Sequence, residues 1–163
     1  MKKTLYHLFE HKDLSREQAR EILCNVARNQ YNEAEITAFI TVYLMRSVRI
    51  EELQGCPDAL LELCVPVSLG GHELMDIVGT GGDGKHTFNI STLSCFIVAG
   101  TGHKVAKHGN YGASSISGSS NVMEQLGYRF TAGNDALNRQ LDGAGICFLH
   151  APLFHPALKV VAP

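Results

Sequence analysis

The amino-acid sequence predicts an α/β protein, in which a small N-terminal helical bundle precedes a truncated parallel-sheet α/β domain. Three observations predict this fold class. Apolar residues recur at helical spacing through residues 1–65, and a segment with a proline and a glycine pair follows at residues 66–73. Short apolar segments then alternate with helical ones through residues 74–163. Strands that alternate with helices are typical of a parallel sheet.

Four helices are expected in the first 65 residues. An apolar face formed by Leu5, Leu8 and Phe9 indicates the first. Capping-box patterns at Ser15 and at Asn32 begin the second and third helices, because each cap is followed three positions later by Gln or Glu. The fourth runs from about Ile50 to Cys64. The third is apolar on more than one face, so the helical domain is the expected dimer interface.

Residues 66–73 are interpreted as a hinge, and residues 74–163 as the first part of the α/β domain. A parallel sheet of only three or four strands leaves an apolar face and a hydrogen-bonding edge uncovered, so we expect the sequence to be the first portion of a larger protein. The expected strands are "LMDIV", "HKVAKHG", "YRFT" and "ICFLHAP", and the expected helices are "STLSCFIVAGTG", "SSNVMEQLG" and "NDALNRQLDGAG", the last capped by Asn134.

Composition excludes several classes of protein. The net charge of −2 disfavours a general nucleic-acid binder, and 45% apolar residues disfavour disorder. No apolar run is long enough to span a membrane, and His7, Glu10 and His11 interrupt any secretory signal, so a cytoplasmic location without membrane attachment is expected. The five cysteines form no CxxC pair and are interpreted as reduced core thiols.

The segment "DIVGTGGDGKHTFNIST", residues 76–92, places four glycines within six positions. Residues 79–84 satisfy GxGxxG, but "KHTFN" is a poor helix start and no acidic residue lies about 20 positions on, as a dinucleotide site requires. A P-loop needs Ser or Thr after Lys85, where His86 stands. A long flexible turn would explain the glycines alone, but not the residues that follow them.

Those following residues favour an anion site. Ser91 and Thr92 are good cap residues immediately before an apolar helix, and a helix N-terminus beside glycine amides attracts phosphate. A second donor-rich segment, "AKHGNYGASSISGSS", follows the next strand. Because loops at the carboxyl ends of neighbouring parallel strands meet over one crevice, the two segments together predict a ligand with several phosphates and a sugar.

Three segments, "GTGGDGKHTFNIST", "KHGNYGASSISGSSNVMEQLG" and "HAPLFHPALK", closely resemble the anthranilate phosphoribosyltransferase family. The resemblance covers essentially the whole sequence. It implies a pentosyltransferase of tryptophan biosynthesis, which transfers phosphoribose from phosphoribosyl pyrophosphate to the amine of anthranilate, releases pyrophosphate and uses Mg²⁺. It also implies a cytoplasmic homodimer that associates through the helical domain.

The resemblance assigns residues of this sequence to three kinds of site. Lys107 and Ser91 are the catalytic candidates, and Ser91 also reaches the metal. Anthranilate would contact Gly79, Asn110 and His155. Phosphoribosyl pyrophosphate would contact Gly79, Gly82, Asp83, Thr87, Asn89, Ile90, Ser91, Thr92, Lys107, His108, Gly109, Asn110, Ser114, Ser115 and Ser119.

The sequence departs from the family pattern in three ways. Tyr111 stands where the family usually has arginine, and Asn121 where it usually has aspartate. The family is about twice as long, and its anthranilate-clamping arginine and acidic magnesium pair lie beyond residue 163. We therefore expect this chain alone to bind weakly and to turn over little or not at all. A pyrimidine nucleoside phosphorylase and a non-catalytic relative that binds nucleotides or nucleic acid are the alternatives.

Overall fold

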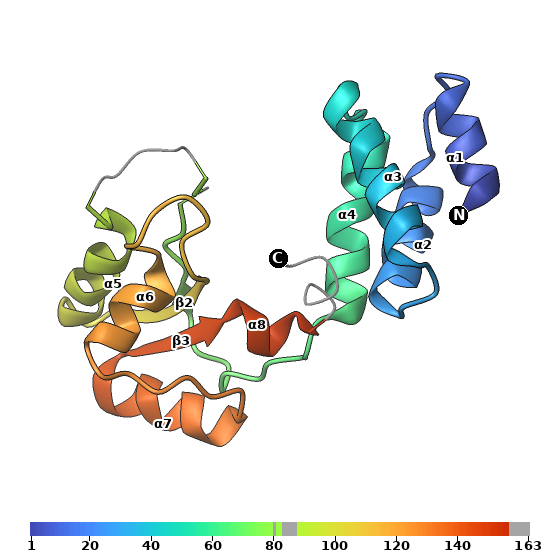
Figure 1. Ribbon diagram of the computed structural model, residues 1–163. Helices are drawn as coiled ribbons and strands as arrows, with labels where there is room; N and C mark the ends of the chain where they lie inside the picture. Colours follow the sequence, from blue (N-terminus) through green and yellow to red (C-terminus); the bar gives the residue numbers. More distant parts are fainter. Residues whose placement is uncertain (80, 83–87, 157–163) are drawn as a thin grey trace. The chain divides into compact units, whose positions relative to one another are not determined.

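The computed structural model describes residues 1–79, 81–82 and 88–156 (Figure 1). Its backbone contacts divide the chain into two compact units. One is Met1–Cys64, which His155 also joins, and the other is Val65–Phe154. None of the helices in the described ranges is long and apolar enough to cross a membrane. All five cysteines are free thiols, and three of them are buried.

The N-terminal unit consists of helices, as predicted. Both capping boxes are confirmed: the Ser15 side chain accepts a hydrogen bond from the amide of Gln18, and the Asn32 side chain accepts one from the amide of Glu35. Each box fixes its helix start from residues only three positions apart, which is why the sequence predicts it well. The helices are α1 (Lys2–Phe9), α2 (Arg16–Ala27), α3 (Glu33–Met45) and α4 (Ile50–Leu63).

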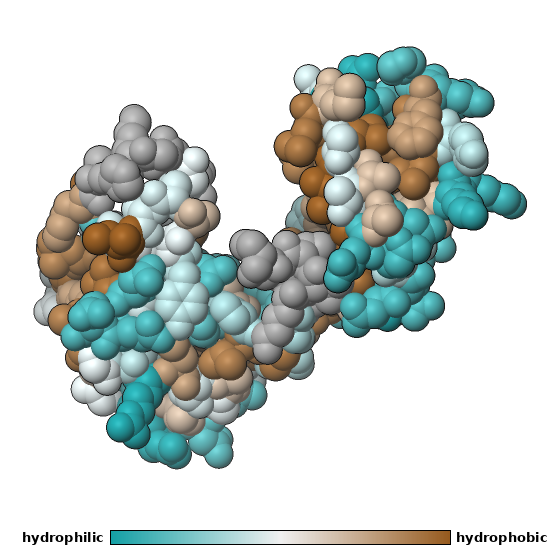
Figure 2. Space-filling model, in the orientation of Figure 1, coloured by the Kyte–Doolittle hydropathy of each residue, from teal (hydrophilic) through white to brown (hydrophobic). Residues whose placement is uncertain are grey.

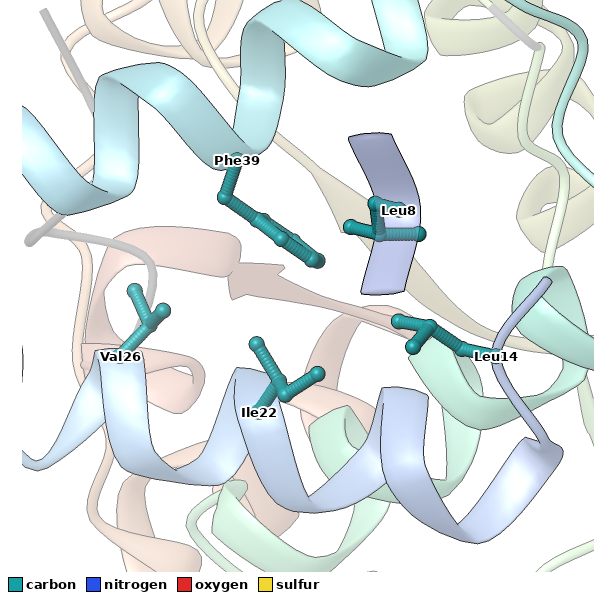
Figure 3. Close-up of a cluster of buried hydrophobic side chains, with 5 residues drawn as sticks. All are labelled: Leu8, Leu14, Ile22, Val26 and Phe39. Atoms are coloured by element: carbon teal, nitrogen blue, oxygen red, sulfur yellow. The ribbon is translucent and has the colours of Figure 1, made fainter. Parts of the chain in front are cut away.

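The core of this unit is an apolar cluster of α1, α2 and α3. Figure 3 shows the ring of Phe39 pointing from α3 toward Leu8, Leu14 and Ile22, and Val26 of α2 belongs to the same cluster. Helix α4 packs closely against α2 at Gly55, where a Cβ atom would stand 2.6 Å from the carbonyl oxygen of Arg16. The close approach of these two helices therefore requires glycine at this position.

A buried carboxylate, Glu52 of α4, joins the helices of this unit. Its oxygens accept hydrogen bonds from the Leu14 amide (3.0 Å), the Tyr43 hydroxyl (3.2 Å) and the Arg49 amide (2.9 Å), and the guanidinium of Arg46 donates two more. Burial disfavours the charged form, but the Arg46 guanidinium and the backbone amides outweigh it and lower the pKa of Glu52 to about 2.

The second unit is built on a three-stranded sheet. All strands are parallel, in the order β1-β2-β3, which confirms the predicted fold class. The register pairs Val105 with Ile146 and Gly109 with His150, so β2 and β3 end side by side. The elements are β1 (Leu74–Met75), α5 (Ile90–Gly100), β2 (Lys104–Gly109), α6 (Ser119–Gln125), α7 (Asn134–Ala144), β3 (Ile146–His150) and α8 (Ala151–Phe154).

Helices cover both faces of this sheet, with α5 and α6 on one side of β3 and α7 on the other (Figure 1). Leu137 and Leu141 of α7 pack with Ala106 and Cys147 in a buried cluster. Side chains alternate between the two faces along a strand, so Lys107 points away from α7.

Several expectations for this unit are corrected. The "YRFT" segment, residues 128–131, is not a strand, because the Tyr128 hydroxyl accepts a hydrogen bond from the Phe148 amide (3.3 Å) and a side chain thus takes the place of strand pairing. Asn134 does not cap α7. Gly133 is the cap, and the side-chain oxygen of Asn134 accepts a hydrogen bond from the amide of Ser68.

The first strand also differs from the prediction, because it is not the buried strand expected from "LMDIV". Only Leu74 and Met75 pair with β2, and Met75 is 46% exposed. Strand β1 lies at the edge of the sheet and has one neighbouring strand among the described residues, which explains its exposure. The last predicted strand also ends earlier, at His150, because Ala151 begins α8.

Candidate functional site

A cleft of about 650 Å³ lies at the carboxyl ends of β1 and β2. We call residues 76–89 the glycine loop and residues 110–118 the serine loop. The described part of the glycine loop lines one wall of the cleft, and the serine loop lines the other. The sequence predicted this convergence, because the carboxyl ends of neighbouring parallel strands share one edge of a sheet.

The glycine loop leads into α5, which is capped by Asn89 rather than by Ser91 or Thr92. The side-chain oxygen of Asn89 accepts a hydrogen bond from the amide of Thr92 (3.0 Å). The helix therefore begins at Ile90, and Ile90 and Ser91 both line the cleft. A helix N-terminus carries a partial positive charge, so this wall favours an anionic ligand.

Two hydrogen bonds fix the walls of the cleft to each other. The side-chain amide of Asn89 donates to the carbonyl oxygen of Ser117 (2.7 Å). The hydroxyl of Thr92, which is 1% exposed, donates to the hydroxyl of Ser119 (3.1 Å). The first turn of α5 and the serine loop therefore form one connected structure.

Two glycines allow the serine loop to close on itself. A Cβ atom at Gly112 would stand 2.0 Å from the carbonyl oxygen of Ser115, and one at Gly118 would stand 2.0 Å from the amide nitrogen of Gly112. Such distances leave no space for a side chain at either position. The Gly112 amide also donates to the side-chain oxygen of Asn121 (3.0 Å).

The buried side chain of Lys107 does not line the cleft. It is 1% exposed, and its ammonium group donates to the carbonyl oxygen of Ile77 (2.7 Å). Asp76, which the sequence analysis did not single out, accepts a hydrogen bond from the amide of His108 (3.1 Å). These two contacts hold the start of the glycine loop against β2. The acidic residue within the otherwise apolar segment "LMDIV" was the available signal for Asp76.

The remaining predicted residues have different positions. Thr92 is buried behind the cleft wall, and His155 belongs to the N-terminal unit. Asp83 and Thr87 lie outside the described residues. The predicted residues that line the cleft are Gly79, Gly82, Asn89, Ile90, Ser91, His108, Gly109, Asn110, Ser114, Ser115 and Ser119.

The described lining contains no Asp, Glu, Lys or Arg, so its polarity comes from hydroxyls, amides, His108 and backbone groups. Phe88 and Tyr111 supply exposed aromatic surface, 68% and 44% exposed, that the sequence analysis did not assign to the site. The Tyr111 hydroxyl donates to Glu124 (2.6 Å). The two departures from the family pattern, Tyr111 and Asn121, thus both take part in hydrogen bonds within the protein.

Two family descriptions match this chain. "Glycosyl transferase family, helical bundle domain" matches residues 2–64, and "Glycosyl transferase family, a/b domain" matches residues 71–163. The chain belongs to this glycosyl transferase family. Residues 65–70 lie between the two matches and overlap the proposed hinge at residues 66–73. The α/β match contains both loops of the cleft.

Curated members of the glycosyl transferase family resemble the chain over its full length. An anthranilate phosphoribosyltransferase of Bacteroides fragilis is 60% identical over 163 residues, and one of Christiangramia forsetii is 55% identical. The match covers 100% of this chain and 49% of each relative, so the chain spans about half the length of these relatives. The resemblance inferred from the three sequence motifs is confirmed.

Solved structures of the glycosyl transferase family share the fold. The crystal structure of anthranilate phosphoribosyltransferase from Thermus thermophilus matches with a TM-score of 0.83 and 33% identity, over 98% of this chain and 48% of that one. The enzyme from Saccharomyces cerevisiae, solved in complex with PRPP and Mg, matches with a TM-score of 0.79 and 26% identity, over 91% of this chain and 45% of that one.

Proposed function

We propose that this chain supplies the phosphoribosyl pyrophosphate site of an anthranilate phosphoribosyltransferase. The observation that carries the proposal is that the N-terminus of α5 and the serine loop line the same cleft, so one ligand can contact both. A Saccharomyces cerevisiae relative was solved in complex with PRPP and Mg, and a variant of it in complex with 4-fluoroanthranilate. The curated relatives carry the name of this enzyme.

The reaction breaks the bond between C1 of the ribose and the pyrophosphate oxygen, and forms a bond between C1 and the anthranilate nitrogen. The electron pair of the broken bond leaves with pyrophosphate, and the new ammonium loses one proton to solvent. Negative charge therefore develops on the departing oxygens. Hydrogen-bond donors that already point at these oxygens stabilise the developing charge, as an oxyanion hole does.

The cleft residues suit that task. Ser91 lies in the first turn of α5, where the partial charge of the helix is positive, and Ser114, Ser115 and Ser119 bring hydroxyl donors from the opposite wall. An arylamine is neutral at pH 7 and needs no strong base before it attacks. Binding and orientation by these neutral donors then supply most of the catalysis. The role of Lys107 is then structural: its ammonium group binds the carbonyl oxygen of Ile77 and holds the start of the glycine loop in place.

Magnesium is expected to arrive with the pyrophosphate. Mg²⁺ in proteins is commonly bound through one or two carboxylates together with substrate phosphates. The described lining of the cleft offers the hydroxyl of Ser91 but no carboxylate, so these residues alone do not form a magnesium site. No group of three or more His, Cys, Asp or Glu suited to a metal occurs in the described part of the chain.

The remaining parts of the proposal follow the resemblance. Anthranilate would contact Gly79, Asn110 and His155, and Asp83 and Thr87 would contact phosphoribosyl pyrophosphate. A cytoplasmic homodimer would associate through the helical unit. Its support is the exposed apolar end of α3, where Leu44 is 81% and Met45 is 84% exposed, and Figure 2 shows apolar surface on this unit.

Isothermal titration calorimetry of the 163-residue chain with phosphoribosyl pyrophosphate and Mg²⁺ tests the proposed site. We expect saturable binding that inorganic pyrophosphate competes for, and that Ser91→Ala weakens. Thymidine with phosphate is the comparison for a nucleoside phosphorylase. Heat changes with thymidine and phosphate, and none with phosphoribosyl pyrophosphate, would replace this proposal with that alternative.

A further inference from the structure

A buried histidine outside the cleft is joined to the α6 end of the serine loop. His150 is the last residue of β3 and is 6% exposed. Its Nδ1 atom lies 2.8 Å from the hydroxyl oxygen of Ser120, which is completely buried. A buried polar atom that loses its hydrogen-bond partner destabilises the folded protein. The contact therefore fixes the positions of both side chains.

Aromatic rings hold the imidazole on two sides. The ring of Phe130 stacks on His150 with a centroid distance of 4.1 Å and an interplanar angle of 11°. The ring of Tyr111, from the serine loop, meets the imidazole edge-on at 5.1 Å and 83°. Burial lowers the pKa of His150, and the neighbouring carboxylate of Glu124 opposes that shift only in part. The neutral imidazole is therefore the form present at pH 7.

The start of the serine loop is bound to α6 at three successive residues. The Asn110 carbonyl oxygen accepts a hydrogen bond from the Ser120 amide (3.0 Å), and the Gly112 amide donates to Asn121. Between them, the Tyr111 hydroxyl donates to Glu124. His150 contacts two members of this set, the side chain of Ser120 and the ring of Tyr111.

We propose that His150 is a positioning residue, which fixes the serine loop to the end of β3 so that its donors face the ligand in the cleft. Asn110 and Ser119 both line the cleft, and each is adjacent to a residue that His150 contacts. The inference rests on the proposed function for the identity of the ligand, phosphoribosyl pyrophosphate. The positioning itself depends only on the contacts of His150.

Three variants isolate the role of His150. His150→Phe keeps a ring between Phe130 and Tyr111 but removes the nitrogen that meets Ser120. Ser120→Ala removes the same hydrogen bond from the other side, and the double variant removes nothing further. His72→Phe is the matched control, because His72 belongs to the same unit and pairs with Asp142 and Lys104 rather than with the serine loop.

Hydrogen exchange of the peptide that contains the serine loop gives the first measurement, without any ligand. We expect faster exchange in His150→Phe and Ser120→Ala, no further increase in the double variant, and wild-type exchange in His72→Phe. Calorimetry with phosphoribosyl pyrophosphate and Mg²⁺ gives the second. The Kd should rise by about tenfold in each single variant and by no more in the double variant, since one hydrogen bond contributes about 1.4 kcal/mol.

The two measurements separate the inference from the proposed function. Unchanged exchange in His150→Phe overturns the positioning role, and so does faster exchange with an unchanged Kd. Effects of the two single variants that add fully in the double variant also overturn it, because independent contributions would then replace the shared hydrogen bond. A wild-type chain that does not bind the ligand contradicts the proposed function, while the exchange data still decide whether His150 holds the loop.

Discussion

The side-chain amide of Asn89 donates a hydrogen bond to the carbonyl oxygen of Ser117 across 2.7 Å, although 28 positions separate the two residues. The same side chain caps α5 through its oxygen, which accepts from the amide of Thr92. One amide group thus starts a helix and joins the two walls of the cleft. Only a side chain with both a donor and an acceptor can do this.

Replacing Asn89 by Asp should separate these two tasks. The carboxylate can still cap α5, so the stability of the α/β unit should change little. It cannot donate to Ser117, and it adds a negative charge beside the proposed pyrophosphate site. We expect the Kd for phosphoribosyl pyrophosphate to rise by at least about tenfold, which calorimetry measures.

Asn32 is the matched control, because its side-chain oxygen caps α3 in the N-terminal unit by the same kind of hydrogen bond, from the backbone amide three positions on. Asn32→Asp should leave the Kd unchanged. Asn89→Ala and Asn32→Ala should each lower the free energy of unfolding of their own unit by about 1 kcal/mol. Equal weakening of ligand binding by the two Asp variants would contradict the role assigned to Asn89.

Gly118→Ala should displace the serine loop. Its Cβ would stand 2.0 Å from the amide nitrogen of Gly112, and backbone must move to accommodate it. We expect a loss of about 2 kcal/mol in the free energy of unfolding and weaker ligand binding. Gly143→Ala is the control: this exposed helical position has open space, so the variant should gain about 0.5–1 kcal/mol. Chemical denaturation measures the free energy of unfolding of both variants. A value for Gly118→Ala equal to that of wild type would refute the close packing of the loop.

The buried carboxylate of Glu52 predicts how the N-terminal unit responds to acid. Its pKa of about 2 in the folded state lies below its ordinary value of 4.5, so the stabilisation is fully present above about pH 4.5 and is lost as the pH falls toward 2. The shift corresponds to about 3 kcal/mol. Glu52→Gln should therefore destabilise the unit at pH 7 by about that amount, with much less difference from wild type near pH 2.

Chemical denaturation at a series of pH values, followed by the NMR signals of α4, measures this effect. The exposed neighbour Glu51 provides the control, since Glu51→Gln should change the free energy of unfolding at pH 7 by less than about 0.5 kcal/mol. The assignment fails if Glu52→Gln is as stable as wild type at pH 7.

The exposed apolar end of α3 predicts the effect of a charge on association. Leu44 is 81% exposed, so Leu44→Glu should leave the folded helical unit intact. If the proposed dimer forms there, the variant should sediment as a monomer at concentrations where wild type sediments as a dimer, because a buried unpaired charge is costly. Analytical ultracentrifugation measures the oligomeric state of both proteins. If Leu44→Glu still sediments as a dimer, the interface lies elsewhere.

Features set by nearby residues were predictable from the sequence. The capping boxes at Ser15 and Asn32 depend on residues three positions apart, and the alternation of strands and helices indicated the parallel sheet. The "YRFT" segment was misassigned because its aromatic residues favour strands, yet the Tyr128 side chain takes the place of backbone pairing at Phe148. Such a contact between distant residues leaves no local pattern.

At the cleft, too, general topology was predictable from the sequence and contacts between distant residues were not. The meeting of the two loops follows from the topology of a parallel sheet, and the sequence predicted it. The burial of Lys107 against Ile77 and the contact of His150 with Ser120 depend on which face of a strand each residue occupies and on what packs there. Neither a short motif nor a hydropathy pattern encodes that information.

NMR spectra of the backbone amides, recorded while phosphoribosyl pyrophosphate and Mg²⁺ are added to the chain, test the proposed cleft most directly. We expect saturable shifts at Ser91, Gly109 and Ser119, from both walls of the cleft, with the amides of α2 and α4 unchanged. Shifts confined to the helical unit, or no shifts at the amides of either wall, would contradict it.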